Sequence, residues 1–441
     1  MALVAAAREE IAAERARIAA GGAPRPIATL AAGLIARLRG LEATIGPARV
    51  INATGVLIHT NLGRAPWPEA AILAAAAATR EPLLLELDPV TGRRGRRFRV
   101  AEDHLVALTG AEDALVTNNG AAALVLAAGL AGRRGIAVSR GELVEIGGGV
   151  RIPEIVRRAG ARLVEVGTTN RTRVADYEAP LRDGTATMVL RVHPSNFTQT
   201  GFIEAPDAAE LAALAHAIGA LVVDDLGSGA LLDTATFGLA HEPMPAERLA
   251  AGADLVLFSG DKLVGGPQAG LVVGRADLVA RLRKDPLARA MRPDKATLAG
   301  MAATLGLYRA GVATREIPVW RMIAVPVEAV RARAEALAAR VTGAATIALL
   351  ATVGGGSLPG ETLPSFGLAL AGRSAASVSR LLAALRTGVP AVLGRIEGGH
   401  VVLDLRTVDP SADADLGRAI ESALSAAVVG ASGLASVMGR R

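Results

Sequence analysis

The chain lacks cysteine altogether, and only 2% of its 441 residues are aromatic. Without cysteine, disulfide bonds, thiolate metal sites and a cysteine nucleophile are excluded. So few aromatic side chains argue against a platform on which single-stranded nucleic acid stacks. The six histidines show no paired metal-ligand spacing, so a metal site has little support in the sequence.

Long hydrophobic runs are also missing, although 51% of the residues are hydrophobic. No apolar stretch reaches the length of a membrane span without glycine or charge. The first residues, MALVAAAREEIAAERARI, predict a charged, alanine-rich helix rather than the apolar core of a signal peptide. We therefore expect a cytoplasmic protein with no membrane partner. Its formal net charge of +6 suits a polyanionic partner such as RNA, but an arginine-rich composition gives the same excess without any function.

Short apolar strands alternate with helices from about residue 50 onward. The expected strands are residues 115–117, 136–139, 162–166, 188–192, 221–225, 255–258 and 270–273. The expected helices include residues 120–131, 152–159, 206–218, 246–251 and 295–310. This alternation predicts an α/β fold in which a mostly parallel, seven-stranded sheet is covered by helices on both faces.

The pattern changes after residue 317, where a small α+β module begins. Its expected helices are residues 327–341, 375–386 and 413–428, and its expected strands are residues 345–353, 392–396 and 401–405. Before the alternating region, two helices are expected over residues 1–20 and 27–44. We therefore predict a helical N-terminal segment (1–46), a large domain (47–312) and a small C-terminal α+β domain (313–441).

Lys262 has an unusual place in the sequence, within DLVLFSGDKLVGGPQAG at residues 254–270. Two apolar strands flank the glycine-rich turn that carries it. Burial lowers the pKa of a lysine amine, and the neutral amine is a nucleophile that forms a Schiff base with the aldehyde of pyridoxal phosphate. A lysine on a surface hairpin gives the same pattern, so taken alone this motif supports both interpretations.

Polar and small residues follow the end of the predicted strand 115–117. Asn118, Asn119, Gly120 and Ala121 open the next helix. Free backbone N–H groups at a helix N-terminus bind phosphate, and ligands of open α/β sheets bind at the carboxyl ends of strands. An ordinary asparagine cap would look the same, so this motif predicts either a phosphate site or a helix cap.

Two more strand ends carry polar side chains. Asp224 and Asp225 end the predicted strand 221–225, and either carboxylate could pair with a protonated pyridine nitrogen, or simply cap a turn. His193 follows the predicted strand 188–192 and is a candidate contact for a cofactor ring or a substrate. A phosphate site, an aspartate and then Lys262, in this chain order at strand ends, is the arrangement of fold-type I pyridoxal-phosphate enzymes.

Longer motifs narrow the class. They are NATGVLIHTNLGRAP at 52–66, EIGG at 145–148, VGTTNRT at 166–172, DLGSG at 225–229, SGDKLVGGPQAG at 259–270 and GGGSLPGETLP at 354–364. From about residue 50 into the C-terminal domain, the chain resembles the bacterial selenocysteine synthases, the L-seryl-tRNA(Sec) selenium transferases. The resemblance covers most of the chain.

The resemblance implies roles for the residues at the cofactor. Lys262 would form the Schiff base with pyridoxal phosphate, with Ser259 and His193 among its neighbours. Asp225 rather than Asp224 matches the family's Asp-Leu-Gly-Ser-Gly motif, and so becomes the expected partner of the pyridine nitrogen. Asp261 stands beside the lysine, where it would assist proton transfer or serve only as a turn residue.

The resemblance also implies a reaction and its substrates. The seryl hydroxyl of seryl-tRNA(Sec) would be eliminated, and selenium from selenophosphate would add to the β-carbon. Arg64, Arg289 and Arg292 would bind the selenophosphate anion, since guanidinium groups suit oxyanions. Solvated surface charge is the alternative for these arginines, because the chain contains dozens of them.

One departure keeps a second hypothesis open. Family members usually have a longer segment before the two N-terminal helices, which takes part in holding the tRNA. The alternative is therefore a related lyase that acts on a small phosphorylated amino acid or amino-sugar acid. In either case the resemblance implies a homo-oligomer, in which dimers assemble into a larger ring of up to a decamer.

Overall fold

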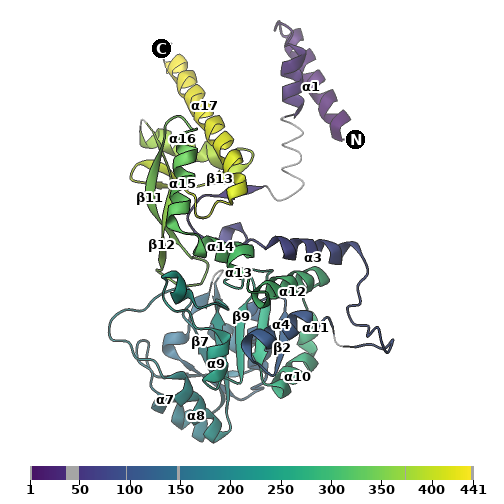
Figure 1. Cartoon of the computed structure of the whole chain (residues 1–441), viewed down its shortest axis with the longest axis vertical. Helices are drawn as coiled ribbons and strands as arrows, with labels where there is room; N and C mark the ends of the chain where they lie inside the picture. Colours follow the sequence, from purple (N-terminus) through teal and green to yellow (C-terminus); the bar gives the residue numbers. More distant parts are fainter. Residues whose placement is uncertain (1, 36–48, 96, 147–148, 373, 439–441) are drawn as a thin grey trace.

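A seven-stranded sheet forms the centre of the larger part of the molecule (Figure 1). The computed structural model describes residues 2–35, 49–95, 97–146, 149–372 and 374–438. The sheet consists of β2 (Asp113–Thr117), β3 (Gly135–Ser139), β6 (Arg162–Val166), β7 (Ala186–Val192), β8 (Leu221–Gly227), β9 (Leu255–Ser259) and β10 (Gly270–Gly274). Their order is β2-β10-β9-β8-β7-β3-β6, and only the pairs that involve β10 are antiparallel. The predicted mostly parallel sheet is confirmed.

Helices cover both faces of this sheet, as strands that are apolar on both sides require. The helices of this part of the chain are α3 (Glu69–Arg80), α4 (Val100–Thr109), α5 (Gly120–Gly129), α6 (Ile152–Arg158), α7 (Val174–Arg182), α8 (Ala208–Ile218), α9 (Pro245–Ala250), α10 (Ala276–Lys284), α11 (Pro286–Ala290), α12 (Lys295–Arg309), α13 (Ala313–Glu316) and α14 (Pro318–Ala324), of which α3 packs on α12. Met188 and Leu190 of β7 pack among α5, α6 and α10, whereas Val189 packs on α7 and α8. Successive side chains of a strand therefore reach opposite helical layers.

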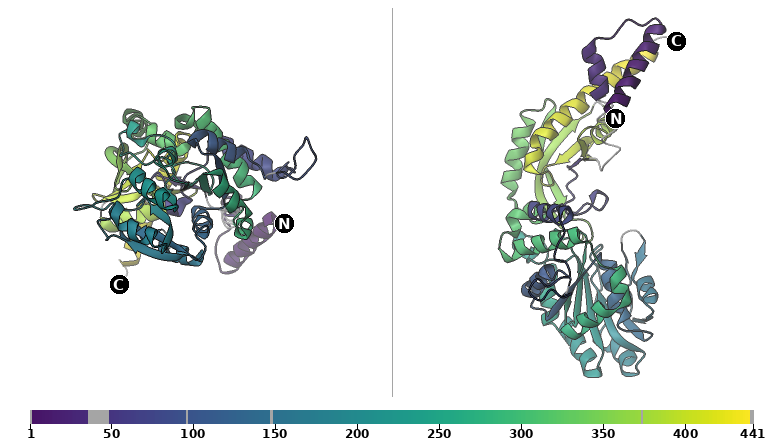
Figure 2. Two further views of the ribbon diagram at one scale, coloured as in Figure 1. Left: turned by 90° about the horizontal axis from the view of Figure 1, so that it is seen from below. Right: turned by 90° about the vertical axis from the view of Figure 1, so that its right-hand side faces the viewer.

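The C-terminal module has its own antiparallel sheet of β11 (Ala344–Thr352), β12 (Thr362–Ala371), β15 (His400–Asp404) and β14 (Arg395–Glu397). Its helices are α15 (Val327–Ala338), α16 (Ala375–Arg386) and α17 (Asp413–Met438). Figure 2 shows this module beyond one end of the large sheet, with α17 pointing away from it. The predicted α+β character of the module is confirmed.

The central strand β12 was not expected from the sequence. Pro364 lies within it, and a proline inside an apolar run argues against a strand because it donates no ladder hydrogen bond. The structure accommodates Pro364 because this half of β12 pairs only with β11, while β15 joins the strand from Gly367 onward.

Residues just before the large domain's first helix join the C-terminal module. β1 (Val50–Asn52) runs parallel to β13 (Ala391–Leu393), and Val56 forms a bridge with Thr352. The backbone N–H of Ile58 then donates to the carbonyl of Val353 at 2.9 Å. This segment therefore ties the C-terminal sheet to the large domain, although the three-part division of the chain stays a prediction.

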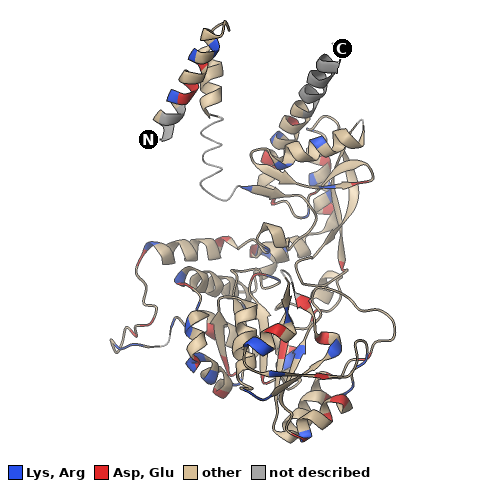
Figure 3. Cartoon of the chain, turned by 180° about the vertical axis from the view of Figure 1, so that it is seen from behind, with Lys and Arg blue, Asp and Glu red and all other residues tan. Residues whose placement is uncertain are grey.

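The N-terminal segment is helical over α1 (Ala2–Ala19) and again over residues 27–35. The carboxylate of Glu14 accepts hydrogen bonds from Arg17 at 2.7 Å and from Arg25 at 2.6 Å, so it joins the first helix to the turn after it. The rest of the predicted helix 27–44 lies outside the described residues. Figure 3 shows basic and acidic residues, coloured on the ribbon, interspersed along the elements seen in that view.

Candidate active site

Lys262 lies in the turn between β9 and β10 and is buried, with 5% of its surface exposed. The turn is held from two sides: the N–H of Leu263 donates to the carbonyl of Ser228 at 3.0 Å, and the hydroxyl of Tyr308 donates to the carbonyl of Val264 at 2.9 Å. The alternative of a surface hairpin lysine is therefore wrong. All five residues of β9 are buried, so the strand delivers the lysine into the interior.

The surroundings of Lys262 lower the pKa of its amine. Burial is the largest cause, and the nearby guanidinium of Arg64 acts in the same direction. The carboxylates of Asp225 and Asp261 oppose the shift without cancelling it. The amine is thus easier to deprotonate than an ordinary lysine, as a nucleophile or a base requires.

A cavity of about 190 Å³ opens in front of this amine. Eight of the residues singled out from the sequence line it: Arg64, Asn119, Gly120, Ala121, His193, Asp225, Ser259 and Lys262. They come from loops and strand ends spread over some two hundred residues of chain. The parallel strands bring them together because their carboxyl ends meet at one edge of the sheet.

The N-terminus of α5 faces this cavity. Asn119 caps the helix, since its side-chain oxygen accepts the N–H of Ala122 at 2.9 Å. Gly120 allows a close approach: a Cβ there would lie 2.9 Å from the hydroxyl oxygen of Ser259. A helix cap and a phosphate site do not exclude each other, because the cap takes up the N–H of Ala122 while Gly120 and Ala121 line the cavity.

The two neighbouring aspartates lie on opposite faces of β8. Asp225 lines the Lys262 cavity, while Asp224 is buried on the other face with its carboxylate 3.6 Å from the guanidinium of Arg248. Burial raises the pKa of Asp225 to about 6, against the lowering effect of Lys262. Asp225 is thus the carboxylate of this pair that a ligand in the cavity can reach.

Arg64 and Asp261 form an ion pair at the edge of the cavity. One guanidinium nitrogen of Arg64 lies 3.1 and 3.0 Å from the two carboxylate oxygens of Asp261. Arg64 adopts a left-handed backbone with φ of 66°, which is uncommon for a residue with a side chain. Asp261 itself does not line the cavity; its carboxylate orients Arg64.

Arg289 and Arg292 are not brought to Lys262 within this chain. Arg289 is exposed on α11, and Arg292 lies 3.6 Å from the carboxylate of Glu86 in a different pocket. The segment is nevertheless close to the helix cap, because the N–H of Asn118 donates to the carbonyl of Met291 at 2.9 Å. Asn118 does not itself line the Lys262 cavity.

Other groups at the cavity were missed in the sequence. Gln268 and Ser195 line it, and Gly356 approaches so closely that a Cβ there would lie 3.1 Å from Nζ of Lys262. Ser195 stands two residues after His193 in the turn that follows β7, so a local signal existed for it. Gly356 comes from the C-terminal module, and no local pattern connects it with Lys262.

The residues present fit pyridoxal phosphate. Lys262 places a poorly solvated amine in the cavity, where it can bond to the cofactor's aldehyde. The buried carboxylate of Asp225 awaits a cationic partner such as a protonated ring nitrogen. Gly120 has no side chain to block the start of α5, which lines the cavity and where the helix dipole favours an anion such as a phosphate.

This sheet with its buried lysine, aspartate and helix N-terminus defines a pyridoxal-phosphate enzyme of fold type I. D-Glucosaminate-6-phosphate ammonia-lyase shares the fold, with a TM-score of 0.63 and 21% sequence identity. That match covers 88% of this chain and 99% of the lyase.

Sequence comparison identifies the family within this class. The profile of the L-seryl-tRNA selenium transferases matches residues 50–409. An L-seryl-tRNA(Sec) selenium transferase of Carboxydothermus hydrogenoformans is 47% identical over 82% of this chain and 78% of its own. One of Methylocella silvestris is 45% identical over 92% of this chain and 89% of its own. The chain belongs to the L-seryl-tRNA selenium transferase family, as its motifs had indicated.

Neither a membrane-spanning helix nor a metal-binding cluster occurs among the described residues. Over the described ranges, no helix combines the length and apolarity that crossing a bilayer demands. Nor do the described residues include a cluster of three or more histidine, aspartate or glutamate side chains that could hold a metal ion.

Proposed function

We propose that this protein converts L-seryl-tRNA(Sec) to L-selenocysteinyl-tRNA(Sec), with pyridoxal phosphate as cofactor and selenophosphate as selenium donor. One observation carries the proposal. A buried Lys262 shares a cavity with Asp225 and the N-terminus of α5, in a chain whose relatives at 45–47% identity are L-seryl-tRNA(Sec) selenium transferases.

Lys262, Asp225 and the N-terminus of α5 each have a role in the proposed reaction. Bound pyridoxal phosphate serves as an electron sink, so that a proton can leave Cα of the seryl group and the hydroxyl can leave its β-carbon. Lys262 holds the cofactor and then, as a free amine of lowered pKa, accepts the Cα proton. Asp225 holds the ring nitrogen, and the first N–H groups of α5 hold the phosphate.

The selenium donor is a small anion and needs cations. Arg64 lines the cavity, and its bond to Asp261 fixes the guanidinium at the cavity edge. Arg289 and Arg292 are the further candidates for this anion. Because Arg289 is exposed and lies outside the cavity of its own chain, it is available to the cavity of a second subunit. An arginine that can reach a second subunit fits the homo-oligomer built from dimers that we propose. We further propose that the dimers assemble into a larger ring, up to a decamer, and that the protein is cytoplasmic.

Cofactor attachment is tested first. Purified protein incubated with pyridoxal phosphate and reduced with borohydride should gain one cofactor mass, located by peptide mapping on Lys262. Lys262→Ala should gain none. Lys284→Ala, which changes an exposed lysine of α10, is the matched control and should label like the unchanged protein.

Substrate choice is tested second. The loaded enzyme should form selenocysteinyl-tRNA(Sec) from seryl-tRNA(Sec) and selenophosphate, detected by mass spectrometry of the released amino acid. The alternative lyase is tested in parallel by ammonia release from D-glucosaminate 6-phosphate. Turnover of the phosphorylated amino-sugar acid without any selenocysteinyl-tRNA would refute the proposal.

A further inference from the structure

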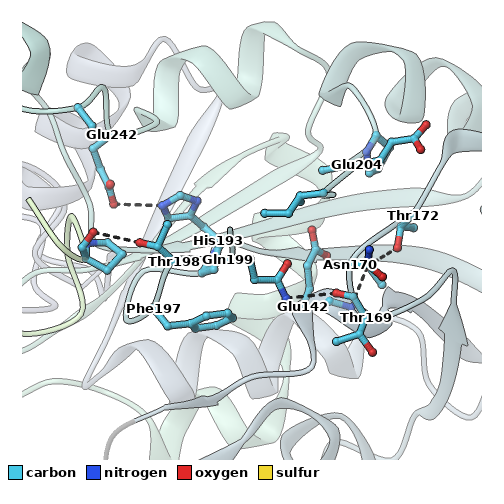
Figure 4. A pocket seen from close by; sticks show the side chains of 18 of the residues that line it. Glu142, Thr169, Asn170, Thr172, His193, Phe197, Thr198, Gln199, Glu204 and Glu242 are labelled. Atoms are coloured by element: carbon cyan, nitrogen blue, oxygen red, sulfur yellow. Dashed lines mark hydrogen bonds and ion pairs between the residues drawn. The ribbon is translucent and has the colours of Figure 1, made fainter. Parts of the chain in front are cut away.

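A second cavity, of about 380 Å³, adjoins the Lys262 cavity and has His193 in common with it. Figure 4 shows His193 with other side chains that line this second cavity. The turn that begins at His193 forms the wall between them: Ser195 and Asn196 line the Lys262 side, while Phe197 and Gln199 line the larger side. The volume lies within the range of small-molecule sites, roughly 300–1,000 Å³. None of the groups proposed above for cofactor or selenium donor, other than His193, lies in it.

The chemistry of this cavity opposes a phosphate. Four carboxylates line it, those of Glu142, Glu204, Glu242 and Glu361. No lysine or arginine is among the described residues that line it, and His241, the second histidine, is already paired with Asp233 at 2.9 Å. An acidic lining of this kind accepts hydrogen bonds from hydroxyl and amino groups. It suits an uncharged, hydroxyl-bearing ligand.

Two carboxamides add a more specific pattern. Gln199 donates one N–H to the carbonyl of Thr169 at 3.2 Å, and Asn170 donates one to the carbonyl of Phe202 at 2.6 Å. Each of these bonds orients its carboxamide and leaves it an oxygen and a second N–H. A carboxamide with one acceptor and one donor free is the group that pairs with the amino group and N7 of adenine. The half-buried ring of Phe197 offers a surface on which a base can stack.

The reaction itself requires a nucleoside at about this place. In an aminoacyl-tRNA the amino acid is an ester of the terminal ribose, and every tRNA ends in adenosine. Only three bonds separate Cα of the seryl group from a ribose carbon, a span of about 4 Å. With the seryl group at Lys262, the ribose must lie in a space that adjoins that cavity, and the cavity beyond His193 is such a space.

We propose that the cavity beyond His193 binds the nucleoside part of the terminal adenosine of the aminoacyl-tRNA. The free hydroxyl of its ribose would lie toward the carboxylates near His193, its base would contact Phe197 and the carboxamide of Gln199, and its 5′-phosphate would lie outside the acidic lining. This rests on the function proposed above. It assigns the recognition of the acceptor end to the turn that follows β7, separately from whatever surface holds the body of the tRNA.

The contact between His193 and the buried Glu242 supports the assignment of this site. One carboxylate oxygen of Glu242, which is 2% exposed, lies 3.4 Å from Nε2 of His193 and has no hydrogen-bonding partner among the described residues. Thr198 fixes the other end of the turn by donating to the carbonyl of Pro359 at 3.1 Å. The turn is therefore held at both ends, so its side chains present a formed site rather than one that must be ordered by the ligand.

The test uses the full chain loaded with pyridoxal phosphate and a stable probe, 3′-deoxy-3′-(L-serylamino)adenosine, whose amide replaces the labile ester. Titration followed by the absorbance of the cofactor gives the Kd. The probe should bind at least tenfold more tightly than L-serinamide, which lacks the nucleoside, since stacking of one base alone is worth roughly that factor. The corresponding inosine probe, without the amino group, should lose most of this gain. Equal affinity for the adenosine probe and L-serinamide would overturn the assignment.

Two variants sharpen the test. Gln199→Ala should bind the adenosine and inosine probes alike, and Phe197→Ala should weaken both by about tenfold or more. Phe202→Ala is the matched control, because that ring is 83% exposed, packs on Arg171 and does not line the cavity. Melting curves and cofactor attachment verify that each variant is folded. If seryl-tRNA(Sec) is turned over but neither pocket variant changes the KM, the nucleoside site is wrong and the proposed function stands. If the unchanged enzyme makes no selenocysteinyl-tRNA, the function fails instead.

Discussion

At the scale of single residues, Asp225 shows how a site built for a ligand affects the protein that carries it. Its carboxylate is mostly enclosed by protein, and only its face toward the cavity meets water. Burial therefore raises its pKa from 3.8 to about 6. Above that pH the protein without cofactor holds a poorly solvated negative charge, which a cationic ring nitrogen would neutralise.

We predict that Asp225→Asn stabilises the cofactor-free protein at pH 8 and destabilises the loaded one relative to the unchanged protein. The raised pKa means that the stabilisation from protonated Asp225 is complete below about pH 4 and lost as the pH rises through 6. This shift of the pKa corresponds to a loss of folding stability of at most about 3 kcal/mol. The cavity keeps one face of the carboxylate hydrated, which makes the loss smaller. Asparagine carries no charge at any of these pH values, so the Asn variant does not undergo this loss of stability.

Thermal unfolding at pH 4 and pH 8, with and without pyridoxal phosphate, measures both effects. The melting temperatures of the two cofactor-free proteins should converge at the lower pH. A cofactor-free Asn variant that is less stable than the unchanged protein at pH 8 would contradict this prediction.

At the scale of secondary-structure elements, β10 decides where α5 begins. Gly270 in this strand pairs with both Thr117 and Ser259, the last residues of β2 and β9. A Cβ at Gly270 would lie 2.1 Å from the carbonyl oxygen of Asn119 and 2.4 Å from the hydroxyl oxygen of Thr117. Because Gly270 has no side chain, the capping residue Asn119 of α5 can lie in contact with β10.

Gly270→Ala should destabilise the protein by about 3 kcal/mol, because backbone atoms must move to admit the methyl group. Gly129→Ala is the matched control: this glycine ends α5, and a Cβ there would meet no atom within 4 Å. It should leave the free energy of unfolding within about 1 kcal/mol of the original value. Urea unfolding followed by circular dichroism measures both, and equal stabilities of the two variants would show that the cap has room to shift.

At the scale of the whole molecule, the C-terminal module contributes part of the site. The loop between β11 and β12 brings Gly356 to Nζ of Lys262. Leu57 and Ile58 hold the start of that loop through hydrogen bonds of 2.9 Å to Thr352 and Val353. The C-terminal module therefore lies against the amine of Lys262, whereas the residues that line the cavity come from the large domain.

Cofactor binding should consequently change the dynamics of both the large domain and the C-terminal module. We expect pyridoxal phosphate to slow amide hydrogen exchange at residues 118–122 and 259–266, and also at residues 354–361 of the C-terminal module. Exchange followed by mass spectrometry, with Lys262→Ala as a control that cannot attach the cofactor, makes the comparison. Protection confined to the large sheet would mean that the two parts act independently.

The sequence by itself determined the class of fold and the centre of the site. Buried strands are short apolar runs, and the glycine-rich turn, the asparagine cap and the aspartates follow them directly, so each of these signals is local in the chain. Lys262 could be singled out for the same reason. The family motifs then indicated the reaction, and sequence comparison confirms the family.

Only the tertiary structure decided how these pieces face one another. It placed Asp225 toward Lys262 and Asp224 away from it, because alternate side chains of β8 reach opposite faces of the sheet. It paired Arg64 with Asp261 across 197 residues of sequence and brought Gly356 from another module. It also opened the cavity beyond His193, whose walls come from loops with no common motif. Such contacts depend on packing between distant segments, which no local pattern of residues encodes.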